Sequence, residues 1–410
     1  MTLRLFNRNF TLLLFGLMSS LFGNTILRFA LSMYILEVTG SATIFASLLA
    51  ISIVPTILLS PFGGILADRA NRRNIMVALD FISGISVLLF SMILSENNVI
   101  PAIGVTLIVL SILAAFEAPT VQACVPQMQE GDNVIRANAI VNQIAAIAGF
   151  VAPILGSVLY TIFGLYPILI ISTVCFFLTA LLEYFIKIDY VSTNIETGIW
   201  SIIKSDFSLS MRFIAKERPY ILKLLLLFAV INFFTAGIST VGMPFMIRNI
   251  LGLDAIYYGA AESALGIAAI AGSIAAGLLV SKLKTNKLYW FIAVLGVSFL
   301  PTGVFFLFNA PTGVSYASII SSFVLAQFVA CIFSIFALSV IQQRTPNELL
   351  GKVMAYISTV SMCAQPLGQM VYGTMFDLLS NRVFLILIPT SIILYLIGIA
   401  SKKMFVHFEK

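Results

Sequence analysis

Four ionisable side chains lie inside long apolar stretches of this sequence, and they are the residues best placed to do chemistry. They are Arg28, Asp80, Glu117 and Glu262. A charged side chain costs about 2.5–3.5 kcal/mol near the centre of an apolar membrane span, so an idle one is expensive to keep. We therefore expect each to be paired or functional. The chemistry open to them is proton binding, ion pairing or binding of a charged ligand.

Depth along the apolar stretches separates the roles expected of these four residues. Asp80 lies less than two helical turns after a basic loop, which favours pairing with that loop. Glu117 and Glu262 are the candidates for carrying a proton, because a carboxyl group reached by water from each side in turn can load and release one. Arg28 is expected either to pair with a carboxylate or to hold an anionic ligand. The single histidine, His407, lies in the C-terminal tail, which excludes a buried histidine relay.

Other polar and aromatic residues belong to the same apolar stretches. Glu183 lies about one turn from the end of its stretch and is expected at the membrane interface. The amides that either line a cavity or bridge helices are Asn24, Asn142, Gln143, Asn232, Gln327, Gln365 and Gln369. The aromatic residues that either form an apolar wall for a bulky ligand or pack in the ordinary way are Phe116, Tyr160, Phe233, Phe234, Tyr258 and Phe328.

The elements that hold these residues must be membrane-spanning helices. The chain of 410 residues is 60% hydrophobic and only 10% charged, whereas a soluble domain carries roughly 25% charged residues. Apolar runs long enough to cross about 30 Å of hydrocarbon recur along it. We predict twelve spans, at Phe10–Leu36, Ala42–Leu66, Ile75–Leu94, Ile100–Cys124, Ile140–Ile162, Leu165–Ile186, Leu224–Ile247, Ile256–Val280, Leu288–Phe308, Val314–Ile341, Val353–Leu379 and Val383–Met404.

Basic residues predict the orientation, because Lys and Arg collect in cytoplasmic loops. With the N-terminus inside, all of the 23 Lys and Arg except Arg28, Arg248 and Arg382 fall in inner segments. Both termini are then cytoplasmic, in the plasma (inner) membrane. The net charge of +6 reflects this bias, so no nucleic-acid partner is expected. The cysteines, which are expected to pack without binding a metal, are Cys124, Cys175, Cys331 and Cys363.

The longest polar connection, Lys187 to Lys223, divides the sequence into halves. It predicts an N-terminal six-helix half at 1–186, a cytoplasmic linker with an interfacial helix at 187–223, and a C-terminal six-helix half at 224–410. The halves share features at one constant spacing. Gly64 corresponds to Gly277, and Pro153 corresponds to Pro366. Such duplication is what an alternating-access transporter requires, since its site lies between two bodies that rock.

The loop after the second span carries the most specific motif. It reads Gly63-Gly64-Ile65-Leu66-Ala67-Asp68-Arg69-Ala70-Asn71-Arg72-Arg73-Asn74. This resembles the loop signature of the major facilitator superfamily: a glycine, then Asp-Arg, then a glycine followed by two basic residues. The resemblance implies a gating latch made of Gly64, Asp68, Arg69, Arg72 and Arg73, with Asp80 beside it. Gly64 is expected to allow close helix approach, and Asp68 to accept bonds from the N-terminal end of a facing helix.

Two departures from the family pattern stand out in these loops. Asn71 replaces the second glycine, and we expect it to take positive φ in a tight turn. The second-half copy of the loop, Ser281 to Lys287, has no aspartate. The latch is therefore expected on one side only.

Span five resembles, more weakly, the glycine-rich antiporter motif of the same superfamily. Gly149, Pro153 and Gly156 are spaced along it, which implies a helix that bends against its partner, although simple helix packing explains the same residues. Further fragments resemble the macrolide-efflux-like drug:proton antiporters. These fragments are Glu37-Val38-Thr39-Gly40-Ser41-Ala42, Arg136-Ala137-Asn138-Ala139 and Leu350-Gly351-Lys352-Val353-Met354.

Together these resemblances imply an all-α membrane protein of the major facilitator fold, with twelve transmembrane helices in two pseudo-symmetric six-helix halves. The implied function is a monomeric secondary-active transporter: a proton-coupled exporter of small hydrophobic or amphipathic compounds that works by alternating access. It is expected to be no enzyme and to need no cofactor. Two alternatives stay open, a dedicated exporter of a physiological metabolite such as a siderophore and a non-transporting membrane sensor on the same fold.

Overall fold

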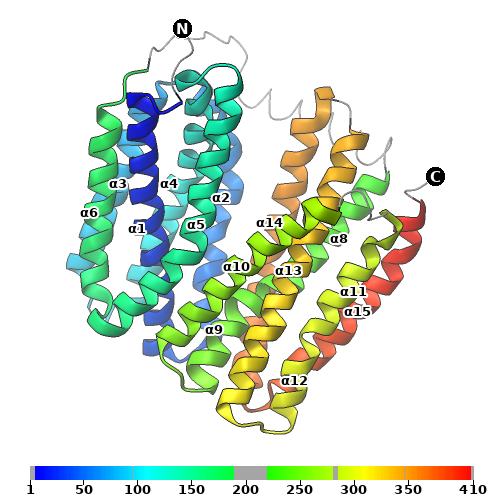
Figure 1. The fold of residues 1–410 in the computed structure, drawn as a ribbon. Helices are drawn as coiled ribbons and strands as arrows, with labels where there is room; N and C mark the ends of the chain where they lie inside the picture. The colour runs from blue at the N-terminus through cyan, green and yellow to red at the C-terminus, as the bar shows by residue number, and fades with distance from the viewer. Residues whose placement is uncertain (1–4, 96, 189–218, 280–284, 346, 408–410) are drawn as a thin grey trace. The chain divides into compact units, whose positions relative to one another are not determined.

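The structure is a computed structural model that describes residues 5–95, 97–188, 219–279, 285–345 and 347–407. These residues form helices joined by short turns, and no strand occurs among them (Figure 1). Eleven helices in the described part are long and apolar enough to cross a membrane. A further helix of 32 residues, α14 (Asn347–Leu378), includes some side chains outside the described set. The predicted all-helical membrane fold of twelve spans is confirmed.

Each predicted span coincides with one of these helices or with a run of them. The first six are α1 (Arg8–Thr39), α2 (Ala42–Arg69), α3 (Arg72–Ile93), α4 (Val99–Met128), α5 (Asp132–Phe163) and α6 (Leu165–Tyr184). The later ones are α8 (Pro219–Ala236), α9 (Met243–Phe245), α10 (Ala255–Leu279), α11 (Leu288–Ser298), α12 (Leu300–Leu307), α13 (Thr312–Arg344), α14 and α15 (Phe384–His407). Residues 189–218, which hold most of the predicted linker and its interfacial helix, lie outside the described residues.

The seventh and ninth spans are interrupted, which hydropathy alone did not indicate. Between α8 and α10 the chain makes π-helical turns at Gly237–Gly242 and Met246–Ile250. A side chain at Gly237 would lie 2.7 Å from the carbonyl oxygen of Gly368, so this position needs glycine for close packing against α14. The ninth span breaks between α11 and α12 just before Pro301, which has no N–H to continue the helical ladder.

The junction between α1 and α2 is fixed from both sides. Gly40 ends α1 at a φ of +60°, in the left-handed conformation that glycine tolerates, and its N–H bonds the carbonyl of Leu36. The start of α2 is capped by Asp377 near the end of α14. Ser41 Oγ donates to Asp377 Oδ2 at 2.6 Å, the N–H of Ala42 to Oδ1 at 2.7 Å, and the N–H of Thr43 to Oδ2 at 2.9 Å. A carboxylate satisfies the free N–H groups of a helix start and complements its dipole.

Contacts group the chain into two compact units. The first contains Met1–Gly40, Leu48–Glu196 and Asp254–Ser263, and the second contains Ser41–Ser47, Thr197–Leu253 and Ala264–Lys410. The boundaries therefore cut through two helices. The first residues of α2 pack within the second unit, and the first residues of α10 pack within the first unit. The sequence placed Glu262 in the C-terminal half, whereas its side chain belongs to the first compact unit.

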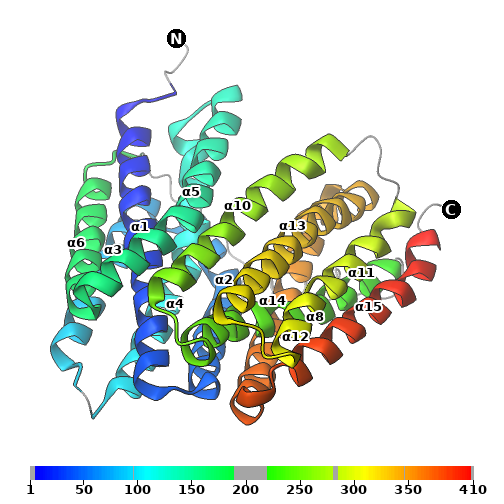
Figure 2. The same ribbon diagram turned by 60° about the horizontal axis from the view of Figure 1, so that its bottom comes forward.

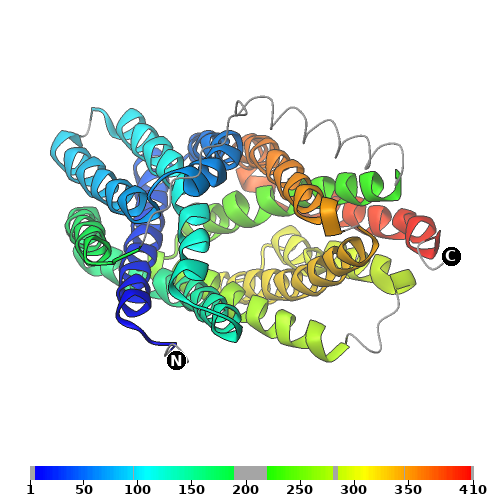
Figure 3. The same cartoon turned by 90° about the horizontal axis from the view of Figure 1, so that it is seen from above.

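In the first unit, α6 packs against α1 and α3, and α5 also packs against α1 (Figure 3, where α1 is dark blue and α6 green). Small residues make the approach of α6 to α1 possible. Thr179 Oγ1 and Ser172 Oγ of α6 donate to the carbonyls of Gly16 and Gly23, each at 3.0 Å. Bonds of this kind between membrane helices contribute about 0.6 kcal/mol each. In the second unit, α11 lies between α13 and α15 (Figure 2).

Candidate functional site

The candidate site centres on Ser20, which lies between Gly16 and Gly23 on the face of α1 toward α6. Its Oγ is 3.0 Å from Asp80 Oδ1 on α3 and 3.2 Å from Glu117 Oε1 on α4. Ser20 and Asp80 are buried, and Glu117 is half-buried. The small neighbours of Ser20 let α1 come close enough to the other helices for one hydroxyl to reach both carboxyl groups.

Glu183 of α6 completes the group, because its carboxyl lies next to that of Asp80. Glu183 was expected at the membrane interface; it lies one residue before the end of α6, and only 2% of the residue is exposed. Asp80 was expected to pair with the basic loop. In the described residues its carboxyl instead faces Ser20 and Glu183. We call Asp80, Glu117 and Glu183 the carboxyl cluster.

Arg28 lies beside the carboxyl cluster on α1. Its Nε donates to Asn24 Oδ1 at 3.0 Å, and its charge interacts with that of Glu117. The interaction with a carboxylate is one of the two roles that the sequence left open for this arginine. Arg28 therefore adds a positive charge next to Glu117.

The loop residues Arg72 and Arg73 fix the ends of the helices that carry the cluster. Arg72 donates through Nε to the carbonyl of Ala67 at 2.8 Å and through Nη1 to that of Ala123 at 3.0 Å. Arg73 donates through Nε to the carbonyl of Tyr184, the last residue of α6, at 3.1 Å, and its guanidinium lies over the Tyr184 ring. A cation at a helix C-terminus stabilises it, so Arg73 holds the end of α6 that bears Glu183.

Asn71 does not take the positive φ expected of it. Its φ is −67°, and it is the N-cap of α3, with its side-chain oxygen accepting from the N–H of Asn74. An asparagine side chain can provide this cap and glycine has none to offer, which accounts for the departure from the family pattern. The side chains of Asp68 and Arg69 lie outside the described residues, so their gating role stays a prediction.

The close helix approach expected at Gly64 occurs at its neighbour instead. No described atom lies within 4 Å of where a side chain on Gly64 would start. At Gly63, by contrast, a Cβ would clash with the carbonyl oxygen of Ala115 and lie 3.1 Å from Phe116 Cα. Gly63 therefore brings α2 against the segment of α4 that leads to Glu117.

Glu262 forms a separate site with Tyr258, one turn earlier on α10. The Tyr258 hydroxyl lies near the Glu262 carboxyl, and the Tyr258 ring stacks on that of Phe29 with centroids 5.3 Å apart. Gly259 lies against α5, where a Cβ would be 2.8 Å from the carbonyl oxygen of Pro153. The predicted motif of α5 thus packs against α10 at Pro153.

The other two glycines of the predicted α5 motif differ from each other in their surroundings. A Cβ on Gly156 would be 3.3 Å from the Phe29 ring, whereas Gly149 faces open space among the described atoms. Gly156 therefore takes part in helix packing and Gly149 does not.

The predicted amides other than Asn24 differ in their surroundings. Asn142 and Gln143 are exposed on α5. In the second unit, Asn232 donates to the carbonyl of Phe228 within α8 at 2.9 Å, and Gln369 donates to Thr240 Oγ1 at 3.0 Å. Gln327 and Gln365 are half-buried in the same unit.

The predicted aromatic residues are divided between the two units. Tyr160 donates to Glu37 Oε2 at 2.7 Å, while Phe233 and Phe234 pack edge-on near Tyr372. Phe328 packs against the apolar core of the second unit. The half-buried Phe116 directly precedes Glu117 in α4.

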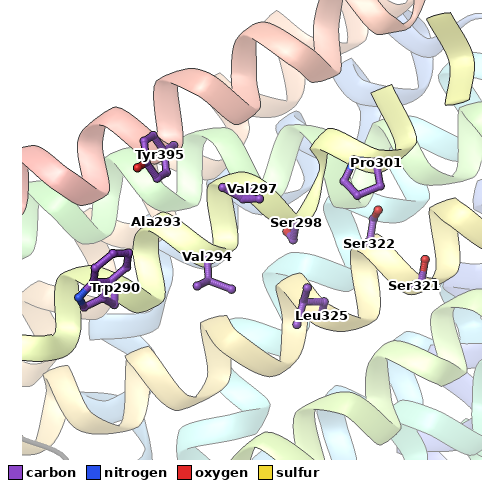
Figure 4. Close-up of a pocket in the computed structure, with 10 residues that line it drawn as sticks. All are labelled: Trp290, Ala293, Val294, Val297, Ser298, Pro301, Ser321, Ser322, Leu325 and Tyr395. Carbon is purple, nitrogen blue, oxygen red and sulfur yellow. The ribbon is translucent and has the colours of Figure 1, made fainter. Parts of the chain in front are cut away.

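A cavity of about 310 Å³ lies among α11, α12, α13 and α15 (Figure 4). Its lining residues are Trp290, Ala293, Val294, Val297, Ser298, Pro301, Ser321, Ser322, Leu325 and Tyr395. The lining is mostly apolar and carries no carboxylate or basic side chain. Trp290 and Leu325 are exposed, as side chains that meet lipid would be.

These features define an all-helical membrane protein with carboxyl groups buried between its spans. The sequence profile of the Major Facilitator Superfamily matches residues 13–369. The chain belongs to the Major Facilitator Superfamily.

Known proteins similar to this chain are transporters. Macrolide efflux protein A of Streptococcus pyogenes is 21% identical over 385 residues, covering 91% of each chain. The crystal structure of a bacterial homologue of the iron transporter ferroportin in the inward-facing state superposes with a TM-score of 0.74 at 16% identity, covering 98% of both chains. The nucleoside transporter NupG superposes with a TM-score of 0.75 at 11% identity, covering 96% of this chain and 99% of NupG. At these identities the structures show a shared fold.

Sequence reasoning missed two members of the site, Ser20 and the buried Glu183. The small residues Gly16, Ser20 and Gly23, at helical spacing on α1, were the available signal, because such a stripe marks a close helix contact. Facing that contact, Glu183 Cγ lies 3.6 Å from where a side chain on Gly16 would start.

Proposed function

We propose that this transporter is a proton-coupled exporter of hydrophobic or amphipathic small molecules that works by alternating access. The similarity to macrolide efflux protein A over 91% of the chain supports the direction and the substrate class. The observation that carries the coupling is the carboxyl cluster, because carboxyl groups buried between spans are costly unless they bind protons or ions. The protein needs no cofactor in this role.

Glu117 and Glu262 are the candidate proton carriers in this proposal. Glu117 contacts the Ser20 hydroxyl and interacts with the cation Arg28. Arg28 offsets the charge of the ionised form, and the protonated form can donate to the hydroxyl. Glu262 lies near the hydroxyl of Tyr258, a group that can both donate and accept. Both termini are proposed to be cytoplasmic in the plasma membrane, with the protein acting as a monomer. Exchange of protons for substrate then follows from opening the site to each side in turn.

The loop from Gly64 to Arg73 is proposed to latch one of the alternating states through Asp68. Changing Asp68→Asn should abolish most transport while leaving insertion intact, since it removes the charge and keeps the volume. The double change Lys282→Ala with Lys284→Ala should have little effect, because the second-half loop has no aspartate. Equal losses from the two changes would contradict a one-sided latch.

The deciding experiment is transport into inverted membrane vesicles. Uptake of a radiolabelled macrolide would be followed after an imposed pH gradient, in competition with cationic dyes and with neutral amphipathic compounds. We expect pH-driven uptake that several unrelated compounds inhibit. Uptake inhibited by a single compound class would indicate a dedicated exporter instead. No pH-driven uptake of any probe would contradict coupled export.

A further inference from the structure

The hydrogen bonds of the carboxyl cluster require more protons than its hydroxyl can supply. Three contacts join four groups: Glu183 to Asp80, Asp80 to Ser20, and Ser20 to Glu117. Each hydrogen bond uses one hydrogen, and the Ser20 hydroxyl has one to give. An ionised carboxylate only accepts. For all three bonds to form, two of the three carboxyl groups must carry a proton.

The oxygens left over in the cluster indicate the same requirement independently. Asp80 and Glu183 are 1% and 2% exposed. Asp80 Oδ2 and Glu183 Oε2 are buried, and no N–H or O–H of another described residue donates to them. Two adjacent buried carboxylates without donors would repel each other and lack solvation, at a cost of several kcal/mol per ion. A proton held between the two groups removes both problems.

The charged and titratable groups around the pair come from every helix that packs on it. Glu117 on α4 interacts with both Asp80 and Glu183, and Arg28 on α1 interacts with Glu117. The thiol of Cys124 on α4 lies within electrostatic range of Glu183 and of Arg72 at the start of α3. Two protonated carboxyls and one carboxylate leave a single negative charge in the cluster, which the charge of Arg28 offsets.

We propose that Asp80 and Glu183 form a second proton-binding site, and that Ser20 passes protons between this pair and Glu117. This inference rests on the proposed coupling role of Glu117. Glu183 lies one residue before the end of α6 and Asp80 lies in the third turn of α3, so in the proposed orientation the pair lies between the cytoplasm and Glu117. Ser20 gives its hydroxyl proton to one carboxylate as it takes the proton of the protonated neighbour, so two O–H bonds break and two form. Rotation of the hydroxyl then resets the relay.

Infrared difference spectroscopy tests this pair directly, without transport. The full chain in lipid nanodiscs would be stepped from mildly alkaline to mildly acidic buffer, and the C=O stretch of protonated carboxyl groups recorded in H₂O and D₂O. We expect a buried carboxyl band in the wild type. Because the pair shares one proton, Asp80→Asn and Glu183→Gln should each remove the same component of the band, and the double variant should remove no more. The exposed Glu130→Gln serves as the matched control and should leave this component intact.

A variant that exchanges the two carboxyl side chains controls for loss of the fold. The double change Asp80→Glu with Glu183→Asp keeps two carboxyl groups in place and should retain the band, and each protein would first be checked for a monodisperse elution profile. If the band component survives in well-folded Asp80→Asn and Glu183→Gln proteins, or if their losses simply add, the shared proton does not exist. Transport separates this outcome from failure of the proposed function. A wild type with the band but without pH-driven uptake would retain the proton site and overturn coupled export.

Discussion

The two compact units bury polar groups of different kinds. In the first, Asp80 and Glu183 lie buried at a site that needs protons for its hydrogen bonds. In the second, the buried polar side chains among the described residues are all neutral. Some of their hydroxyls bond one another, as Thr302 Oγ1 bonds Ser322 Oγ at 2.8 Å and Tyr372 bonds Thr390 at 2.7 Å, and others donate to backbone carbonyls. A hydroxyl supplies its own hydrogen to such a bond. If the proposed proton coupling holds, pH should act on the first unit more than on the second.

The largest effect should come from Glu117→Gln. It keeps the volume and removes the proton site beside Arg28, so uphill, pH-driven transport should be abolished while downhill exchange of substrate persists. Both modes can be measured in proteoliposomes. Full pH-driven accumulation by this variant would show that Glu117 is not the group through which the first unit couples protons to transport.

A smaller loss is expected from Glu262→Gln, since Glu262 lies in the first unit although it belongs to the C-terminal half of the sequence. Uphill accumulation should fall by about tenfold, and Tyr258→Phe, which removes only a neutral hydroxyl whose hydrogen bond would be worth about 1 kcal/mol, should lower it by about fivefold. The comparison uses initial rates under an imposed pH gradient. If Glu117→Gln and Glu262→Gln both transport at full rate, neither carries the proton.

Ser20→Ala should have a moderate effect that depends on pH. Removing the hydroxyl breaks the path between Asp80 and Glu117 and leaves both carboxyl groups without their hydrogen-bond partner, a cost of about 1–3 kcal/mol. We expect a reduced rate and a displaced pH profile. The neighbouring Ser19→Ala is the matched control, because Ser19 Oγ only donates to the carbonyl of Cys175. Identical pH profiles for the two variants would remove Ser20 from the relay.

The smallest effect should come from the second unit, in Gln369→Met. This change loses the bond to Thr240, yet Thr240 keeps its bond to the carbonyl of Ala236, and a buried amide oxygen without a donor is removed. Thermal stability should change by the equivalent of about 1 kcal/mol or less, and the pH profile should not move. A displaced profile would mean that the second unit also takes part in proton coupling.

The sequence predicted the spans because hydrocarbon thickness sets a length that hydropathy reveals directly. It also predicted that Glu117 lies within a span, because an ionisable residue stands out in an apolar run. It did not predict which neighbours each side chain faces. Asp80 was assigned to the loop because it is close in sequence, whereas the packing of α1, α3 and α6 turns it toward Ser20. Likewise, Gly63 rather than Gly64 makes the close contact, a choice of one residue that depends on how α2 is rotated against α4.

Glu262 shows another limit of reasoning along the chain. Hydropathy divided the protein at its longest polar connection, yet the first turns of α10 pack with the helices before that connection. Helix packing, and not chain order, decides which residues share a compact unit. The contacts of Tyr258 with Phe29 and of Gly259 with Pro153 could be found only once the helices were placed in space.

The cap on α2 has a consequence for how the chain is made. Ser41 and Asp377 are separated by 336 residues, so most of the protein is synthesised after α2 before the carboxylate that binds its first N–H groups exists. Until then those groups depend on water or on lipid headgroups. The first N–H groups of α2, one of the first helices to be inserted, therefore gain their hydrogen-bond partners only when α14, one of the last, is in place.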